Sequence, residues 1–140
     1  MIQSANNDEF IQVKVSEVGF TDLSRLQGVL VLETEDGKVF PISSFSGEVA
    51  EHIERFKSGD RTSVPTIYKM FSEFADRANM FLNSVEIFEK NGVMRSNIQF
   101  VGRNNSIILE NYRASDSIAL ATFYDAPISM KKELLERLSE

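Results

Sequence analysis

Apolar and polar residues alternate over residues 10–16, which is the pattern of a β-strand with one face in solvent. Residues 28–34 are more continuously apolar and β-branched, so they predict a second, more deeply buried strand. The Asp36-Gly37 dipeptide is a strong signal for a hairpin turn, and residues 38–42 are expected to return as the partner strand.

Two helices are predicted after this hairpin. Ser44 or Ser46 can cap the first, with Glu48 in its first turn. The second is entered through Pro65, a residue that suits a first helical turn. Its apolar positions recur at the clearest helical spacing in the chain. They are Ile67, Met70, Phe71, Phe74, Ala75 and Ala78.

The second half of the chain repeats this order of patterns. Residues 81–89, 93–101 and 106–110 predict three strands, and Asn91-Gly92 predicts a tight turn between the first two. The order resembles a duplication, although no repeat is visible residue by residue.

The stretch around which these elements are expected to pack runs from Tyr112 to Met130. It contains a short apolar helix, predicted from Ser115 to Tyr124, before Pro127 interrupts the chain. Ser129 is then expected to cap a last charged helix that runs to about residue 138. The predicted fold is α+β, a single domain with mixed or antiparallel sheets and the element order βββαα-βββαα.

The rest of the chain suggests one domain over residues 10–140, preceded by a flexible polar tail over residues 1–9. Apolar residues make up 42% of the chain, enough for a substantial core. No apolar run approaches the length of a membrane helix, and no signal peptide is visible at the start, so no membrane partner is expected. The absence of cysteine excludes disulfides and fits a cytoplasmic protein.

The net charge of −6 weighs against broad, non-specific binding of duplex nucleic acid, which needs many basic residues. It does not exclude a local basic site or a metal-bearing cleft that holds nucleic acid. A single histidine makes a Ser-His-Asp triad or a histidine-rich zinc site unexpected.

Arg113, Ser115 and Asp116 form the first candidate site. In the simpler interpretation they start a helix: Ser115 is the N-cap, Asp116 complements the helix dipole, and Arg113 pairs with Asp116. In the functional interpretation, free N–H groups and the Arg113 guanidinium bind a phosphate, alone or bridged by a metal. Spacing alone favours the helix start.

Glu48 allows the same two interpretations, because a glutamate in a first helical turn commonly complements the dipole. If folding brought Glu48 close to Asp116, the two carboxylates could ligate Mg²⁺ or Mn²⁺ and assist hydrolysis. His52 and Tyr68 are each expected at the rim of a helix rather than in a catalytic role.

Several of these residues resemble the sequence signature of the bifunctional nuclease (BFN) family. Tyr-Arg-Ala-Ser-Asp-Ser-Ile-Ala-Leu-Ala, over residues 112–121, and Asp-Ala-Pro-Ile, over 125–128, are similar to the family's R-P-S-D-A-[IL]-A-L-A…API segment. Residues 40–42 and 47–50 resemble its upstream LPI and EA segments. The resemblance covers about residues 10–138.

This resemblance implies a single α+β domain, a homo-oligomer of two or more copies, and nuclease activity on DNA or RNA. The implied site residues are Glu48, Arg113, Ser115 and Asp116, with Glu48 and Asp116 as ligands of Mg²⁺ or Mn²⁺. The chain departs from the family pattern at Ala114, where the family has proline. It departs again at residues 43–45, and at residues 67–69, where Ile-Tyr-Lys replaces Thr-His-Asp.

Two alternatives to a nuclease therefore stay open. One is a non-catalytic oligomeric or regulatory domain that kept the fold and lost the chemistry, since a tyrosine with a pKa near 10 is a poor base where an imidazole would serve. The other is a sensor that binds a small anionic ligand beside Arg113 and Ser115.

Overall fold

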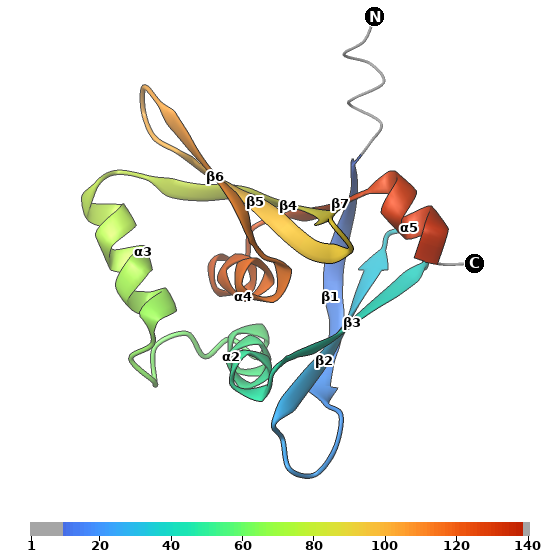
Figure 1. Cartoon of the computed structure of the whole chain (residues 1–140). Helices are drawn as coiled ribbons and strands as arrows, with labels where there is room; N and C mark the ends of the chain where they lie inside the picture. The colour runs from blue at the N-terminus through green and yellow to red at the C-terminus, as the bar shows by residue number, and fades with distance from the viewer. Residues whose placement is uncertain (1–9, 139–140) are drawn as a thin grey trace, which may run out of the picture.

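The computed structural model describes residues 10–138 as one curled sheet with helices inside the curl and beside it (Figure 1). The expected tail, residues 1–9, lies outside the described residues. The strands are β1 (Phe10–Phe20), β2 (Gln27–Thr34), β3 (Val39–Ser46), β4 (Phe81–Lys90), β5 (Val93–Val101), β6 (Ser106–Arg113) and β7 (Ile128–Lys131). The helices are α2 (Gly47–Lys57), α3 (Ile67–Arg77), α4 (Ala114–Tyr124) and α5 (Lys132–Leu138).

The sheet has seven strands in the order β3-β2-β1-β7-β4-β5-β6. Neighbouring strands are antiparallel except for β4 and β7, which pair in parallel, so the sheet is mixed. The α+β fold predicted from the sequence is confirmed. Each half of the chain forms one three-stranded antiparallel meander, and β7 joins the two.

The predicted element order is wrong at one place. Residues after Pro127 form strand β7 before the last helix, so Ser129 lies within a strand and does not cap a helix. Ile128 and Met130 are buried where β7 runs between β1 and β4. A run of four residues is too short to show a convincing alternation, and its strand character comes from two neighbours far away in sequence.

The two expected glycine turns are present. The β2–β3 turn is closed by Gly37, which has a φ of 93° and donates its N–H to the carbonyl of Thr34. In the β4–β5 turn both central residues, Asn91 and Gly92, have positive φ, as a two-residue hairpin turn of the right twist requires.

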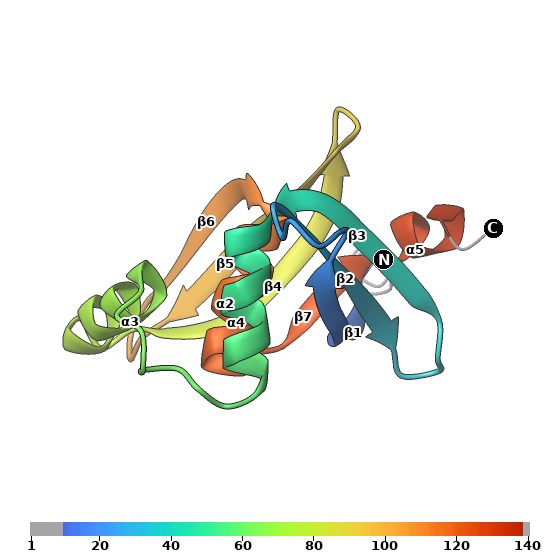
Figure 2. The same cartoon turned by 90° about the horizontal axis from the view of Figure 1, so that it is seen from below.

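Helices α2 and α4 lie together within the curl of the sheet (Figures 1 and 2). Helix α4 is covered on every side, with Ile118, Ala119 and Ala121 fully buried, whereas α2 buries one face through residues such as Ile53 and Phe56. The ring of Phe56 meets that of Phe123 edge-on at 5.0 Å. The apolar stretch expected to organise the fold is thus its central helix.

Helix α3 stands at one end of the molecule, beside the meander formed by β4, β5 and β6 (Figures 1 and 2). Thr66 caps it through a hydrogen bond to the N–H of Lys69, so Pro65 precedes the cap instead of lying in the first turn. The expected apolar stripe is present, but Ala75 is its only buried member. None of the described helices is long and apolar enough to cross a membrane.

Candidate functional site

The start of α2 positions Glu48. Of the two serines that could cap this helix, Ser46 does so: its Oγ accepts the N–H of Glu48 at 3.1 Å. Gly47 fits here because a Cβ would overlap the carbonyl oxygen of Arg25, and its own N–H donates to Leu26. The Glu48 side chain is 80% exposed. The Ser46 hydroxyl is therefore used to cap the helix backbone, and the Glu48 carboxylate lies at the surface.

The start of α4 differs from the expectation in one respect. Arg113 is the N-cap residue, and no side chain caps the helix, so the prediction that Ser115 is the N-cap is wrong. Ser115 lies inside the first turn and is buried. Asp116 is the acidic residue of that first turn, as expected. The helix begins earlier because the chain enters it directly from strand β6.

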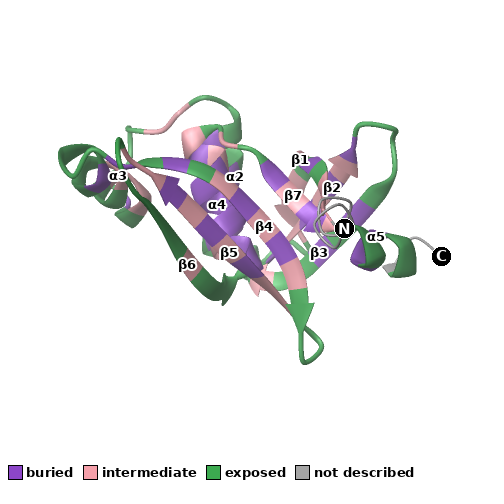
Figure 3. Ribbon diagram, turned by 90° about the horizontal axis from the view of Figure 1, so that it is seen from above, coloured by how far each residue is buried: buried purple, intermediate pink, exposed green. Residues whose placement is uncertain are grey.

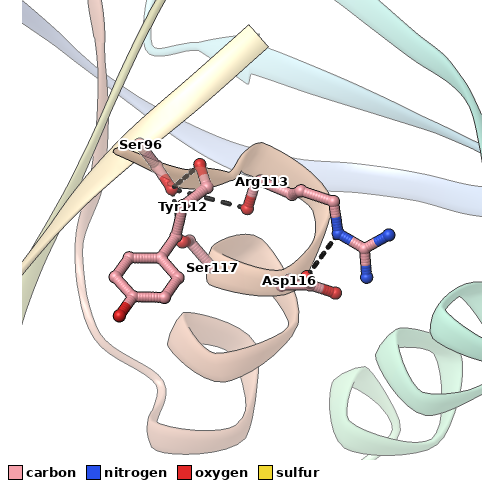
Figure 4. Close-up of polar contacts among 5 residues, drawn as sticks. All are labelled: Ser96, Tyr112, Arg113, Asp116 and Ser117. Atoms are coloured by element: carbon pink, nitrogen blue, oxygen red, sulfur yellow. Dashed lines mark hydrogen bonds and ion pairs between the residues drawn. The ribbon is translucent and has the colours of Figure 1, made fainter. Parts of the chain in front are cut away.

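Arg113 and Asp116 form an ion pair across this turn, with Arg113 Nε 2.7 Å from Asp116 Oδ2 (Figure 4). Asp116 raises the pKa of Arg113, first through this hydrogen bond and then through its charge. The Arg113 side chain is 68% exposed. Because the bond uses Nε, the guanidinium still carries four N–H donors on its two Nη atoms for an anion.

A buried serine pair fixes the turn from β6 into α4. Ser96, on β5, hydrogen-bonds to Ser117, on α4, and its Oγ also lies 3.2 Å from the carbonyl oxygen of Tyr112 and 3.5 Å from that of Arg113 (Figure 4). Both serines are completely buried. These contacts join β5, β6 and α4 beside Arg113, so they fix the position of its backbone.

Tyr68, from α3, links the two helix starts electrostatically. The pKa of Tyr68 is raised to about 12, first by burial and then by the charges of Asp116 and Glu48, while the charge of Arg113 opposes the rise. Charges on α2 and on α4 thus act on one phenol. At neutral pH Tyr68 keeps its proton, so it can donate a hydrogen bond but cannot serve as a base.

His52 lies between these groups on α2. Its ring stacks on Phe56 at 5.9 Å and meets Tyr68 edge-on at 5.3 Å. Arg55 Nη2 lies 2.7 Å from His52 Nδ1, and because a guanidinium can only donate, Nδ1 is the acceptor. The ring proton of the neutral imidazole is then on Nε2, which faces Glu48 Oε2 at 4.0 Å.

Burial lowers the pKa of His52, and the charge of Arg55 lowers it further, against the opposing charges of Glu48 and Glu51. The imidazole is therefore neutral at pH 7. Arg55 therefore fixes the tautomer of the ring, with the Nε2 proton on the side of Glu48.

The number of nearby acidic side chains limits which metal ions Glu48 and Asp116 could bind. Across residues 10–138, no three His, Cys, Asp or Glu side chains are grouped closely enough to hold a metal ion. Two carboxylates without a third protein ligand do not fit zinc, which takes three or four. An ion held by Glu48 and Asp116 would have to be one such as Mg²⁺ or Mn²⁺, which keep several waters and use one or two carboxylates together with substrate phosphates.

Sequence patterns pointed to Glu48, Arg113 and Asp116 but not to the importance of His52, Tyr68 or the Ser96–Ser117 pair. His52 and Tyr68 each look like a helix rim residue when their own helix is considered alone. The one available signal was their helical phase, since each adjoins the apolar stripe of its own helix.

The sequence model of the bifunctional nuclease domain matches residues 30–140 of the chain. No curated protein matches the chain.

Proposed function

This chain belongs to the bifunctional nuclease domain family, and from that premise we propose that it hydrolyses phosphodiester bonds of DNA or RNA with the help of Mg²⁺ or Mn²⁺. The proposed site lies at the starts of α2 and α4. The observation that supports it most directly is that Glu48, Asp116 and Arg113 all act on the phenol of Tyr68. Two acidic residues and one basic residue thus lie near enough to Tyr68 for their charges to act on its phenol.

In this proposal Arg113 binds the phosphate. Its Nη groups supply paired donors of the geometry that phosphate oxygens accept, and Asp116 fixes the guanidinium through Nε. The buried serine pair beneath the turn holds the backbone from which Arg113 extends. Tyr68 keeps its proton and is a further donor toward the phosphate.

Glu48 and Asp116 are the proposed ligands of the divalent ion. The ion would supply Lewis-acid activation of water and charge neutralisation at the phosphate. The neutral imidazole of His52 faces Glu48 with Nε2 at 4.0 Å, so it is a donor toward the same ligand sphere. The overall acidity of the chain does not oppose this function, because the substrate is held at a local cation rather than by a broad basic surface.

The test is cleavage of single- and double-stranded DNA and of RNA by the purified protein with Mg²⁺ or Mn²⁺. Asp116→Asn and Glu48→Gln should each lower the rate about 100-fold, because each removes one charge from a site built on few charges. Glu54→Gln is the matched control: it makes the same chemical change on α2, six positions from Glu48, and should cut at the normal rate. Equal cleavage by the wild type and Asp116→Asn would show that the assigned site is wrong.

A non-catalytic role is the second candidate, and a specific observation favours it. Tyr68 lies where the family pattern has a histidine, and its high pKa rules it out as a general base near neutral pH. In that case the helix starts would bind a small anionic ligand without cleaving it. Thermal shift with nucleotides and inorganic phosphate separates the two. A shift that Arg113→Ala abolishes, without metal-dependent cleavage, would support the binding role.

The cytoplasmic location expected from the absence of cysteine stays a prediction.

A further inference from the structure

Tyr112 presents an aromatic surface to solvent at the edge of the sheet. It lies on β6, an edge strand that is exposed along nearly its whole length (Figure 3). Tyr112 itself is 50% exposed. The rings of the other two tyrosines, Tyr68 and Tyr124, pack edge-on against neighbouring aromatic rings. Within residues 10–138 the ring of Tyr112 meets no other aromatic ring, so it is open to a ligand.

A β-bulge sets the direction of Tyr112. The β5–β6 ladder pairs Ile98 with Leu109. Two positions away on β5, Ser96 pairs with Tyr112, which is three positions away on β6. The extra residue is accommodated at Asn111, which has a φ of 68° and donates its N–H to a side-chain oxygen on β5 at 3.1 Å. Because side chains alternate along a strand, the bulge moves Tyr112 to the face of Leu109, which is a recurrent use of bulges beside functional sites.

The backbone that carries Tyr112 also carries Arg113. Ser96 Oγ lies 3.2 Å from the carbonyl oxygen of Tyr112 and 3.5 Å from that of Arg113. From this shared anchor the two side chains extend in different directions (Figure 4). A single exposed aromatic residue is ordinary. Tyr112 differs because one buried hydroxyl holds its backbone together with that of an exposed guanidinium.

A nucleotide presents the matching pair of groups, a flat base and a phosphate joined through one sugar. Bases stack on exposed aromatic side chains, and every base has a face that can do so. Phosphate oxygens accept the paired donors of a guanidinium. Stacking requires no positive charge. It therefore suits a chain of net charge −6, which cannot gain affinity by neutralising many phosphates.

We propose that Tyr112 stacks on the base next to the phosphate that Arg113 binds. This inference rests on the proposed function, because it takes Arg113 as the phosphate-binding residue. A base inside a duplex is already stacked between its neighbours and does not reach Tyr112. The subsite therefore takes an unpaired nucleotide of DNA or RNA, in a single strand or at a frayed end.

The first test is binding of a short, fluorescently labelled oligothymidine to the full chain, followed by anisotropy in EDTA. Without free divalent ions the strand is not cleaved by a metal-assisted reaction, so the result does not depend on activity. Tyr112→Ala should bind about tenfold more weakly, since one stacked base is lost, whereas Tyr112→Phe keeps the ring and should bind like the wild type. Phe81→Ala is the matched control. Phe81 is an equally exposed aromatic residue at the other end of the meander, opposite Val101, and its loss should not change binding.

An abasic strand supplies the second measurement, because it keeps every phosphate and has no base to stack. The wild type should bind it about tenfold more weakly than the intact strand. Tyr112→Ala should bind the two strands alike, since the stacking contact can be lost only once. Arg113→Ala should weaken binding of both strands by the same factor.

Equal binding of the intact and abasic strands by the wild type would overturn the proposal. So would a wild type that binds neither strand, or a Tyr112→Ala variant that loses the same factor on both, since the latter marks a structural role. Failure of the proposed function has a different result. A protein that binds the intact strand through Tyr112, yet does not cleave it with Mg²⁺ or Mn²⁺, would lose the hydrolytic role and keep this subsite.

Discussion

The ring of Tyr68, on α3, meets the ring of His52, on α2, edge-on at a centroid separation of 5.3 Å. Through this contact α3 touches α2, the helix that bears Glu48. It also places the phenol of Tyr68, which keeps its proton at neutral pH, beside the neutral imidazole of His52. The contact makes the first prediction possible, because only one of the two rings titrates in the physiological range.

His52 should make the protein less stable in mild acid. Burial lowers its pKa in the folded state, so the unfolded chain binds a proton more readily. Stability is therefore complete above the unfolded value of about 6.5 and falls as the pH drops through it. His52→Phe keeps a ring against Phe56 and Tyr68 but cannot titrate. The melting temperature of the wild type should fall more between pH 7.5 and pH 5.5 than that of His52→Phe.

Carboxylates titrate in both of these proteins and therefore cancel in the comparison. Identical pH slopes would show that His52 has the same pKa in both states.

Arg113→Ala should separate activity from stability. The ion pair with Asp116 is largely in solvent, so its loss should lower the free energy of unfolding by no more than about 1 kcal/mol. If Arg113 binds the phosphate, the same change should lower the cleavage rate by about 100-fold. Urea unfolding and a cleavage assay on one preparation test both parts. A large loss of stability would mean that Arg113 is a structural residue.

Arg113→Lys is the informative companion variant. Lysine keeps the charge but loses the forked donors, so a proposal based on paired donors predicts little rescue. Full activity in Arg113→Lys would contradict that geometry.

The Ser96–Ser117 pair should behave as a coupled unit. Ser96→Ala removes the hydroxyl that bonds to Ser117 and to the Tyr112 carbonyl, and should cost about 1–3 kcal/mol because buried polar groups lose their partner. Ser117→Ala should cost a similar amount. The double variant should lose less than the sum of the two, measured by urea unfolding. Strict additivity would mean that the two hydroxyls act independently.

Tyr124→Phe should leave stability unchanged or raise it. The Tyr124 hydroxyl is buried and has no hydrogen-bond partner within the described residues, and its burial raises the pKa of this phenol. Removing a buried donor that is not satisfied recovers about 1 kcal/mol or more of desolvation. The ring contacts with Phe100 and Phe123 remain in the variant. Destabilisation by more than 1 kcal/mol on urea unfolding would show that the hydroxyl is satisfied in solution.

The parts of the fold that could be predicted are those encoded locally. Asn91-Gly92 and Gly37 set the hairpin turns through their backbone preferences, and the apolar run that begins after Asp116 predicted a buried helix. Strand β7 could not be predicted, because four residues become a strand only when β1 and β4 flank them. Its position depends on pairing across most of the chain.

The candidate site divides in the same way. The Arg113–Asp116 pair follows from a spacing of three residues at a helix start and was anticipated. The closeness of His52 to Tyr68 arises from the packing of two helices, and spacing along either one carries no information about it. Ser115 was misassigned because Arg113 enters α4 directly from β6, so the helix starts two positions earlier than a Ser115 cap would place it.

Strand β7 also determines when the two meanders can be joined. It is the only described connection between β1 and β4, and it follows the other six strands in the sequence. On the ribosome each meander can form as it emerges, but the two cannot be joined into one sheet until Ile128 and Met130 have left the exit tunnel. A chain stalled or cleaved before Pro127 would therefore expose two unpaired edges at once, each a site for aggregation.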